Sequence, residues 1–102
     1  MSNNCLQLSG ELISSPKLTK SPAGIVHCKF KMKHESRQTE ANFIRQCFCI
    51  MPIVVAGEMA TQVSNQIEKG SKIKVSGFLA SHKTQSGNGE LVLHAQYIEK
   101  II

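Results

Sequence analysis

The sequence has 102 residues, enough for one domain with a single modest core, which we assign to residues 1–102. Twelve lysines and arginines outweigh seven acidic residues, and the formal net charge of +5 favours a polyanionic partner. No apolar run approaches the about 18 residues of a membrane span, and the start MSNNCLQ lacks a signal sequence, so we expect a soluble, cytoplasmic protein with no membrane contact.

The first predicted strand covers residues 5–14, where apolar and polar residues alternate. Its inward positions are Leu6, Leu8, Gly10 and Leu12. A glycine at such a position is typical of a strongly bent strand. Ser14-Ser15-Pro16 ends the strand, and we expect residues 17–24 to form a loop that carries Lys17 and Lys20.

The second predicted strand, residues 25–35, has the clearest alternation in the chain. The apolar face comprises Val26, Cys28, Phe30 and Met32. Lys29, Lys31 and Lys33 share the opposite face and repel one another unless something neutralises them. This row indicates either an anion-binding surface or a solvated face. Residues 36–41 are polar and predict a connector, so the second and third strands form a hairpin.

The third predicted strand lies within residues 42–56, NFIRQCFCIMPIVVA, the longest apolar run of the chain. Alternation places Cys47, Cys49 and Met51 on one face and Phe48 on the other. We expect a β-bulge near residues 45–47, because a bulge would turn Phe43, Arg45 and Phe48 together toward solvent.

One helical pattern follows, in which Met59, Val63 and Ile67 recur at intervals of four, and Lys69-Gly70 is expected to end it. Strand alternation resumes over residues 71–83, with Gly77 on the inward side, and again over residues 90–98. A turn at residues 84–89 joins the last two strands.

This order predicts an all-β fold, a five-stranded OB-fold Greek-key barrel with one short helix between the third and fourth strands. Such barrels bind oligonucleotides on one face and through two loops. A small β-sandwich is the competing architecture, and the single helix favours the barrel.

The sequence offers little support for metal or catalytic chemistry. Cys47 and Cys49 are one residue too close for a chelating pair, so we expect reduced, buried thiols and no zinc. His27 and Cys28 point to opposite faces of a strand and cannot form a nucleophilic pair. No catalytic triad, carboxylate pair or phosphate-binding loop appears, and we predict neither an enzyme nor a cofactor.

Binding of single-stranded nucleic acid needs a basic track for the phosphates and aromatic platforms for the bases. Phe43 and Phe48 are the candidate platforms, although a phenylalanine in a strand is more often part of the core. Alternation places Phe30 on the core-facing side of its predicted strand and Phe78 on the outward side of its own. The candidate track comprises Arg45, Lys17, Lys20, Lys29, Lys31, Lys33, Lys72, Lys74 and Lys83.

Four stretches resemble the primosomal replication protein N (PriB) family and, through it, the single-stranded DNA-binding protein family. They are residues 8–30, the pattern FIRQCFCIMPIVVAG at 43–57, GSKIKVSGFLASHK at 70–83 and LVLHA at 91–95. The resemblance covers essentially the whole chain. It implies an OB-fold homodimer that binds single-stranded DNA, contacts the PriA helicase and DnaT, and stimulates replication restart without enzymatic activity.

The same resemblance implies that Phe43 and Phe48 face DNA and that Arg45 and Lys83 make its basic contacts. The chain also departs from the family pattern, in which position 48 is commonly tryptophan. A basic family position is Glu35 here, and family lysines in the loop before the last strand are replaced by Gln85 and Glu90. The three lysines of the second strand are more charge than expected there, so the DNA path is expected to shift toward that strand.

Two other functions remain open from the sequence. One is a protein adapter whose basic face docks acidic partners, with incidental nucleic-acid affinity. The other is an RNA-binding OB-fold protein, which would prefer rU over dT oligomers.

Overall fold

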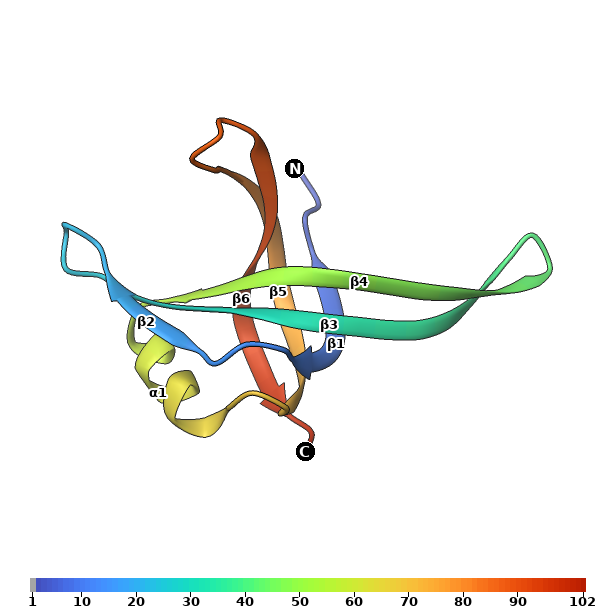
Figure 1. Ribbon diagram of the computed structural model, residues 1–102, viewed down its shortest axis with the longest axis horizontal. Helices are drawn as coiled ribbons and strands as arrows, with labels where there is room; N and C mark the ends of the chain where they lie inside the picture. The colour runs from blue at the N-terminus through green and yellow to red at the C-terminus, as the bar shows by residue number, and fades with distance from the viewer. Residues whose placement is uncertain (1) are drawn as a thin grey trace.

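The computed structural model describes residues 2–102 as a closed β-barrel from which one long hairpin projects (Figure 1). Along the described chain the elements are β1 (Leu6–Leu12), β2 (Lys17–Lys20), β3 (Val26–Glu40), β4 (Phe43–Ala56), α1 (Glu58–Gln66), β5 (Lys72–Lys83) and β6 (Gly89–Lys100). The predicted all-β barrel with one short helix is confirmed. The structure adds β2 to the five predicted strands, so the helix lies between β4 and β5.

The strands follow one another in the sheet in the order β1-β5-β6-β4-β3-β2, and β1 closes the barrel by also pairing with β3. The first strand pairs with β5 from Leu6 to Glu11 and turns onto β3 at Glu11 and Leu12. The β4–β6 pairing is parallel and joins Ile53 to Leu93. All other pairings among the described residues are antiparallel.

Two glycines permit close backbone contacts at the bends of the barrel, as their inward positions predict. A Cβ on Gly10 would overlap the carbonyl of Lys33, and a Cβ on Gly77 would overlap the carbonyl of His94. The β5–β6 register also shifts between Ser76 and Gly77. Strong bending therefore occurs where glycine leaves room for the neighbouring strand.

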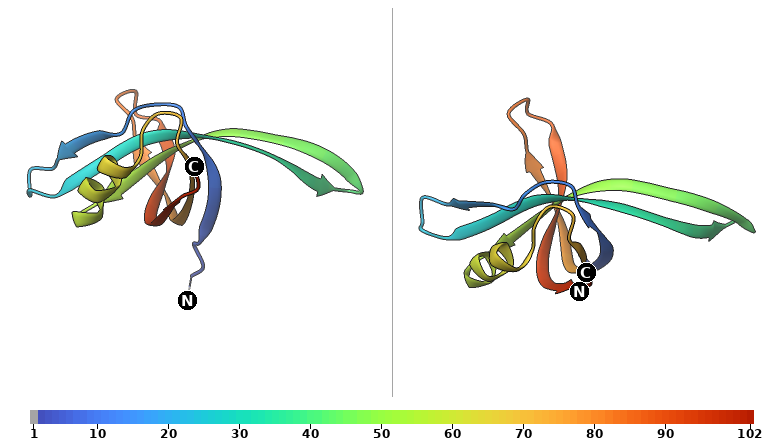
Figure 2. Two further views of the ribbon diagram at one scale, coloured as in Figure 1. Left: turned by 90° about the horizontal axis from the view of Figure 1, so that it is seen from below. Right: turned by 60° about the horizontal axis from the view of Figure 1, so that its bottom comes forward.

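The barrel core consists of the inward residues of the strands, with α1 packed against β2, β3 and β4 at one end (Figures 1 and 2). Phe30 is 4% exposed, as its parity predicts. Ala60, Val63 and Ile67 bury the apolar stripe of the helix. The helix ends at Gln66 rather than at Lys69-Gly70, because Ile67 adopts an extended conformation and packs into the core.

Two predicted connectors are strands. Residues 17–20 pair with β3, Lys17 opposite Lys29, although the sequence predicts a loop there. Residues 36–40 continue β3, and the turn is only Ala41 and Asn42, with φ of 51° and 67°. Both segments are polar because they are largely exposed, so they lack the apolar alternation that identifies a buried strand.

The β-bulge predicted near residues 45–47 is wrong. The β3–β4 register runs without a shift from the His27–Ala56 pair to the Glu40–Phe43 pair. Strand alternation therefore continues through β4 and places Phe43 and Arg45 on the face opposite to Phe48.

The outer part of this hairpin, residues 34–49, is named the distal arm here. Figure 2 shows from two further sides that it extends away from the other strands.

The expectation of buried thiols holds only for Cys28, whose pKa is raised by burial in the barrel. Cys47 and Cys49 are half-buried and Cys5 is exposed, and all four thiols are free. The arm lacks the second layer that would bury its thiols.

Candidate nucleic-acid interface

The outward side of β3 and β4 forms a surface that we call the basic face. Across the two strands Lys29 pairs with Val54, Lys31 with Pro52 and Lys33 with Ile50. Cross-strand partners share a face, so a column of lysines runs beside a column of apolar residues. Successive lysines are about 6.8 Å apart along the strand. Lys29 and Lys31 are exposed and Lys33 is half-buried.

The basic face continues across neighbouring strands. Lys17 of β2 lies opposite Lys29, which adds a cation on the outer side. On the side of the hairpin away from β2, Val54 of β4 pairs with His94 of β6. The β5–β6 pair of His82 and Glu90 extends the surface further. Five strands thus contribute to one face.

At the start of the distal arm, Phe48 lies on the basic face with 62% of its surface exposed. Its cross-strand partner is Glu35, and the next pair on this face is Arg37 with Gln46. These side chains line a shallow hollow of about 400 Å³. Phe48 offers a ring for stacking, with an acidic neighbour that a phosphate would avoid.

The other face of the distal arm carries Phe43 and Arg45. Phe43 is 75% exposed, and Nη1 of Arg45 lies 3.1 Å from Oε1 of Glu40. This ion pair is exposed on both sides, so it contributes little stability and leaves the guanidinium free to exchange partners.

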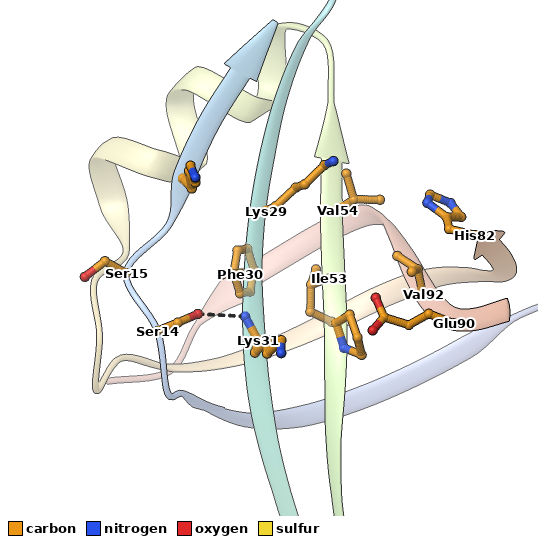
Figure 3. A pocket seen from close by; sticks show the side chains of 12 residues that line it. Ser14, Ser15, Lys29, Phe30, Lys31, Ile53, Val54, His82, Glu90 and Val92 are labelled. Atoms are coloured by element: carbon orange, nitrogen blue, oxygen red, sulfur yellow. Dashed lines mark hydrogen bonds between the residues drawn. The ribbon is translucent and has the colours of Figure 1, made fainter. Parts of the chain in front are cut away.

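A groove of about 480 Å³ lies between the β1–β2 connection, the β3–β4 hairpin and the β5–β6 hairpin (Figure 3). Val54 and Val92, 4% and 5% exposed, contribute to its apolar floor. Lys17, Lys29, Lys31, His82 and Glu90 are its charged or titratable lining residues. One wall is fixed by the backbone N–H of Lys31, which donates to Oγ of Ser14 at 3.0 Å.

A second hollow, of about 340 Å³, adjoins the groove and is lined by Lys20, His27, His82 and His94 among others. The Nε2 atoms of His82 and His94 are 2.7 Å apart, and the His94 ring stacks on Phe78 with centroids 4.9 Å apart. Burial lowers the pKa of His94, and nearby His82 and His27 lower it further. His94 thus has a hydrogen-bonding partner in His82 and a stacking partner in Phe78 within the fold.

The structure brings together only part of the predicted site. The basic face and its groove collect Lys17, Lys29, Lys31, Lys33 and Phe48. The remaining predicted residues lie elsewhere: Phe43 and Arg45 on the opposite face of the arm, Lys20 in the second hollow and Lys83 at the tip of the β5–β6 hairpin. Lys74 lies 3.9 Å from Glu99 on the β1–β5–β6 side.

Sequence reasoning missed the groove residues Pro52, Val54, Val92 and His82, and it identified Glu90 only as a departure from the family pattern. Apolar residues such as Val54 carry the same sequence signal whether they line a groove or fill the core. The groove depends on the β4–β6 pairing, which no local pattern reveals. Among residues 2–102 there is no cluster of three potential metal-ligating side chains, and none of the helices in that range could cross a bilayer.

Comparisons with known proteins identify relatives of this chain. A family model described as another single-strand binding protein family matches residues 4–97. The replication restart protein PriB of Yersinia pseudotuberculosis is 45% identical over 101 residues, covering 99% of this chain and 96% of the relative. PriB of Vibrio vulnificus is 47% identical over 95 residues, covering 93% and 95%.

Solved structures give the same fold. PriB from Ralstonia solanacearum has a TM-score of 0.81 at 26% identity, covering 99% of this chain and all of that one. The wild-type single-stranded DNA binding protein from Thermus aquaticus has a TM-score of 0.82 at 20% identity, and this likeness concerns the fold alone. The match covers 98% of this chain but only half of the Thermus protein.

Proposed function

The chain belongs to the single-strand binding protein family, among the replication restart proteins PriB, and from this premise we propose that it binds single-stranded DNA through the basic face. Membership of a family of binding proteins agrees with the expectation that the chain is not an enzyme. We place its action in the cytoplasm, at stalled replication forks.

One observation carries the proposal: the lysine column of β3 lies directly beside the apolar column of β4. Single-stranded DNA presents phosphates along one side and base faces along the other, and proteins bind it with cations and apolar or aromatic platforms. Lys29, Lys31 and Lys33 would take the phosphates. Phe48 would stack on a base, with less area than a tryptophan offers.

The remaining predicted contacts belong to the same proposal as extensions of the DNA path. Lys17 and Lys20 would hold the strand near β2, and Lys83 would do so at the tip of the β5–β6 hairpin. Phe43 and Arg45 would contact a strand that passes around the end of the distal arm.

We further propose that the chain contacts the PriA helicase and DnaT, and thereby stimulates helicase loading and fork restart. The exposed Phe43 face of the distal arm supports this second, adapter-type role, because it points away from the lysine column.

A homodimer is also proposed. Among the described residues no strand pairs with the outer edge of Leu6–Gly10, and an open strand edge is a site where a second chain can add.

The test is fluorescence anisotropy of a labelled oligo-dT across a salt series, with Lys29, Lys31 and Lys33 all changed to alanine. The logarithm of the single-strand affinity falls linearly with the logarithm of the salt concentration, with a slope of about −0.7 per neutralised phosphate. We expect the triple variant to bind more weakly, with a log–log slope shallower by about two. A control changes Lys69 and Lys100 to alanine, which removes two charges from exposed positions outside the candidate track.

An equal loss of affinity per charge removed in the two variants would show that only net charge matters and would refute a track along β3. Absence of binding by the parent protein at low salt would favour the adapter function instead. A preference for rU over dT would favour the RNA-binding alternative.

A further inference from the structure

Glu90 is an acidic residue in a groove that is otherwise lined by basic, apolar and serine side chains. It lines the groove together with Lys17, Lys29 and Lys31, yet it forms no ion pair within 4.0 Å with any of them. The two ion pairs among residues 2–102 join Arg45 to Glu40 and Lys74 to Glu99. A carboxylate beside a phosphate track weakens DNA binding through like-charge repulsion, unless the ligand brings a hydrogen-bond donor to it.

The geometry of the groove indicates which part of a nucleotide would reach this carboxylate. Figure 3 shows Glu90 extending from its strand toward Ile53, with Ser14 and Ser15 on the opposite side of the groove. The floor of the groove is apolar: Ile53 lies between Glu90 and Ser14 in Figure 3, and Val54 and Val92 also line the groove. The volume of about 480 Å³ lies within the range of about 300–1,000 Å³ common for small-molecule sites. An apolar floor accepts the face of a base, and Glu90 then lies at its edge.

The chemistry of base edges distinguishes the possible occupants. A carboxylate accepts hydrogen bonds through two oxygens and donates none. Guanine presents two adjacent donors on its Watson–Crick edge, N1–H and the N2 amino group, which match both oxygens. Adenine and cytosine each place a single amino group beside a ring nitrogen that accepts. Thymine presents one N–H between two carbonyl oxygens, which repel a carboxylate.

We propose that this groove is a guanine-preferring subsite and that Glu90 is its specificity-determining residue. The inference rests on the proposed binding of single-stranded DNA and deepens it, because it adds a base preference to a basic, otherwise sequence-tolerant face. The lysines around the groove hold the neighbouring phosphates, and the apolar floor excludes water from one side of the hydrogen-bonded pair.

The experiment compares three labelled oligonucleotides of equal, short length: oligo-dT, the same oligo-dT with one central dG, and the same with one central deoxyinosine. Deoxyinosine keeps the N1–H of guanine but lacks the N2 amino group. We expect the dG oligonucleotide to bind about fivefold more tightly than oligo-dT, the lower end of what a bidentate contact discriminates. The deoxyinosine oligonucleotide is expected to lose most of that preference.

Two variants isolate the carboxylate. Glu90→Gln replaces one oxygen acceptor by an amide donor, so we expect the dG preference to disappear while oligo-dT binds slightly better. Glu90→Lys adds a cation to the groove, so it is expected to tighten binding of all three oligonucleotides. Glu90 is exposed in the β5–β6 hairpin, so both variants are expected to keep the unfolding midpoint of the parent.

Equal binding of the oligo-dT and dG oligonucleotides by the parent protein overturns the inference and leaves the proposed function intact. A dG preference that survives in Glu90→Gln also overturns it, because another group then reads the base. If the parent protein binds none of the oligonucleotides, the proposed function itself fails, and the subsite fails with it.

Discussion

The hairpin of β3 and β4 has two halves built on one continuous ladder, and they differ in what their side chains contact. In the barrel half, Met32 and Val55 are fully buried. In the distal arm, Phe43 and Ile44 are 75% and 72% exposed. The strands and their register are the same throughout, so the difference comes from the other barrel strands, which cover only one half.

This contrast shows that a strand pattern does not by itself distinguish core from ligand contact. Alternation fixes which side chains share a face, and the second layer decides whether that face is buried. Inward-facing apolar residues in the barrel half therefore stabilise the fold. The same residue types in the arm lie exposed beside basic residues, where they are available to a partner.

The largest expected effect separates the two halves by stability. Met32→Ala removes a fully buried side chain and is expected to destabilise the protein by about 2–5 kcal/mol. Ile44→Ala removes an exposed side chain of similar size and should change stability by no more than about 0.5 kcal/mol. Urea unfolding of both variants measures the difference. Equal losses would mean that a partner, such as a second copy of the chain, covers the arm.

The next effect separates the two faces of the arm. Phe48→Ala is expected to weaken binding of oligo-dT by about 1–3 kcal/mol, the usual value for loss of a stacking platform. Phe43→Ala, on the opposite face, is expected to have a smaller effect. Anisotropy titrations at one salt concentration compare them. A larger loss for Phe43→Ala would show that the DNA follows the other face of the arm.

A smaller effect concerns the turn that ends the arm. Ala41 has a φ of 51°, a left-handed conformation that disfavours a residue with a Cβ. We expect Ala41→Gly to stabilise the arm by about 0.5–1 kcal/mol, after the entropic cost of glycine. Slower amide hydrogen exchange near Glu40 would measure it. Asn42→Gly is the matched control, and it should gain less because asparagine tolerates this conformation better.

The smallest expected effect is a pH dependence on the barrel side. The pKa of His94 is lowered in the folded protein, by burial first and by His82 and His27 second. Below a pH of 6.5, the ordinary pKa of histidine, the unfolded chain binds a proton at His94 that the folded protein binds less readily. The free energy of unfolding therefore falls as the pH decreases through this region. The urea midpoint of His94→Gln should fall less over the same pH range. An unchanged pH dependence would assign the effect to other groups.

The sequence predicts the barrel half well because burial there leaves a periodic signal. The alternation of Val26 to Met32, the helical stripe that includes Val63, and the bend glycines Gly10 and Gly77 all appear in the structure as expected. Each of these signals reflects a local requirement for an apolar side chain or for no side chain. Such requirements are visible without knowing the partner strand.

The sequence predicts the arm and the groove poorly for the opposite reason. Residues 36–40 are strand only because β4 pairs with them, and their polar composition carries no trace of that pairing. Plain alternation along β4 places Phe48 and Phe43 on opposite faces, whereas the predicted bulge wrongly placed them on the same face. Glu90 enters the groove through contacts among distant strands, which local patterns do not encode.

The unshifted ladder of β3 and β4 also determines how this hairpin can change in length. One residue added to one strand would exchange its two faces beyond that point, and would move Phe48 away from the lysine column. Two residues added to each strand would lengthen the arm and keep every side chain on its original face. The reach of the arm can therefore vary in paired steps, separately from the chemistry of the surface it presents.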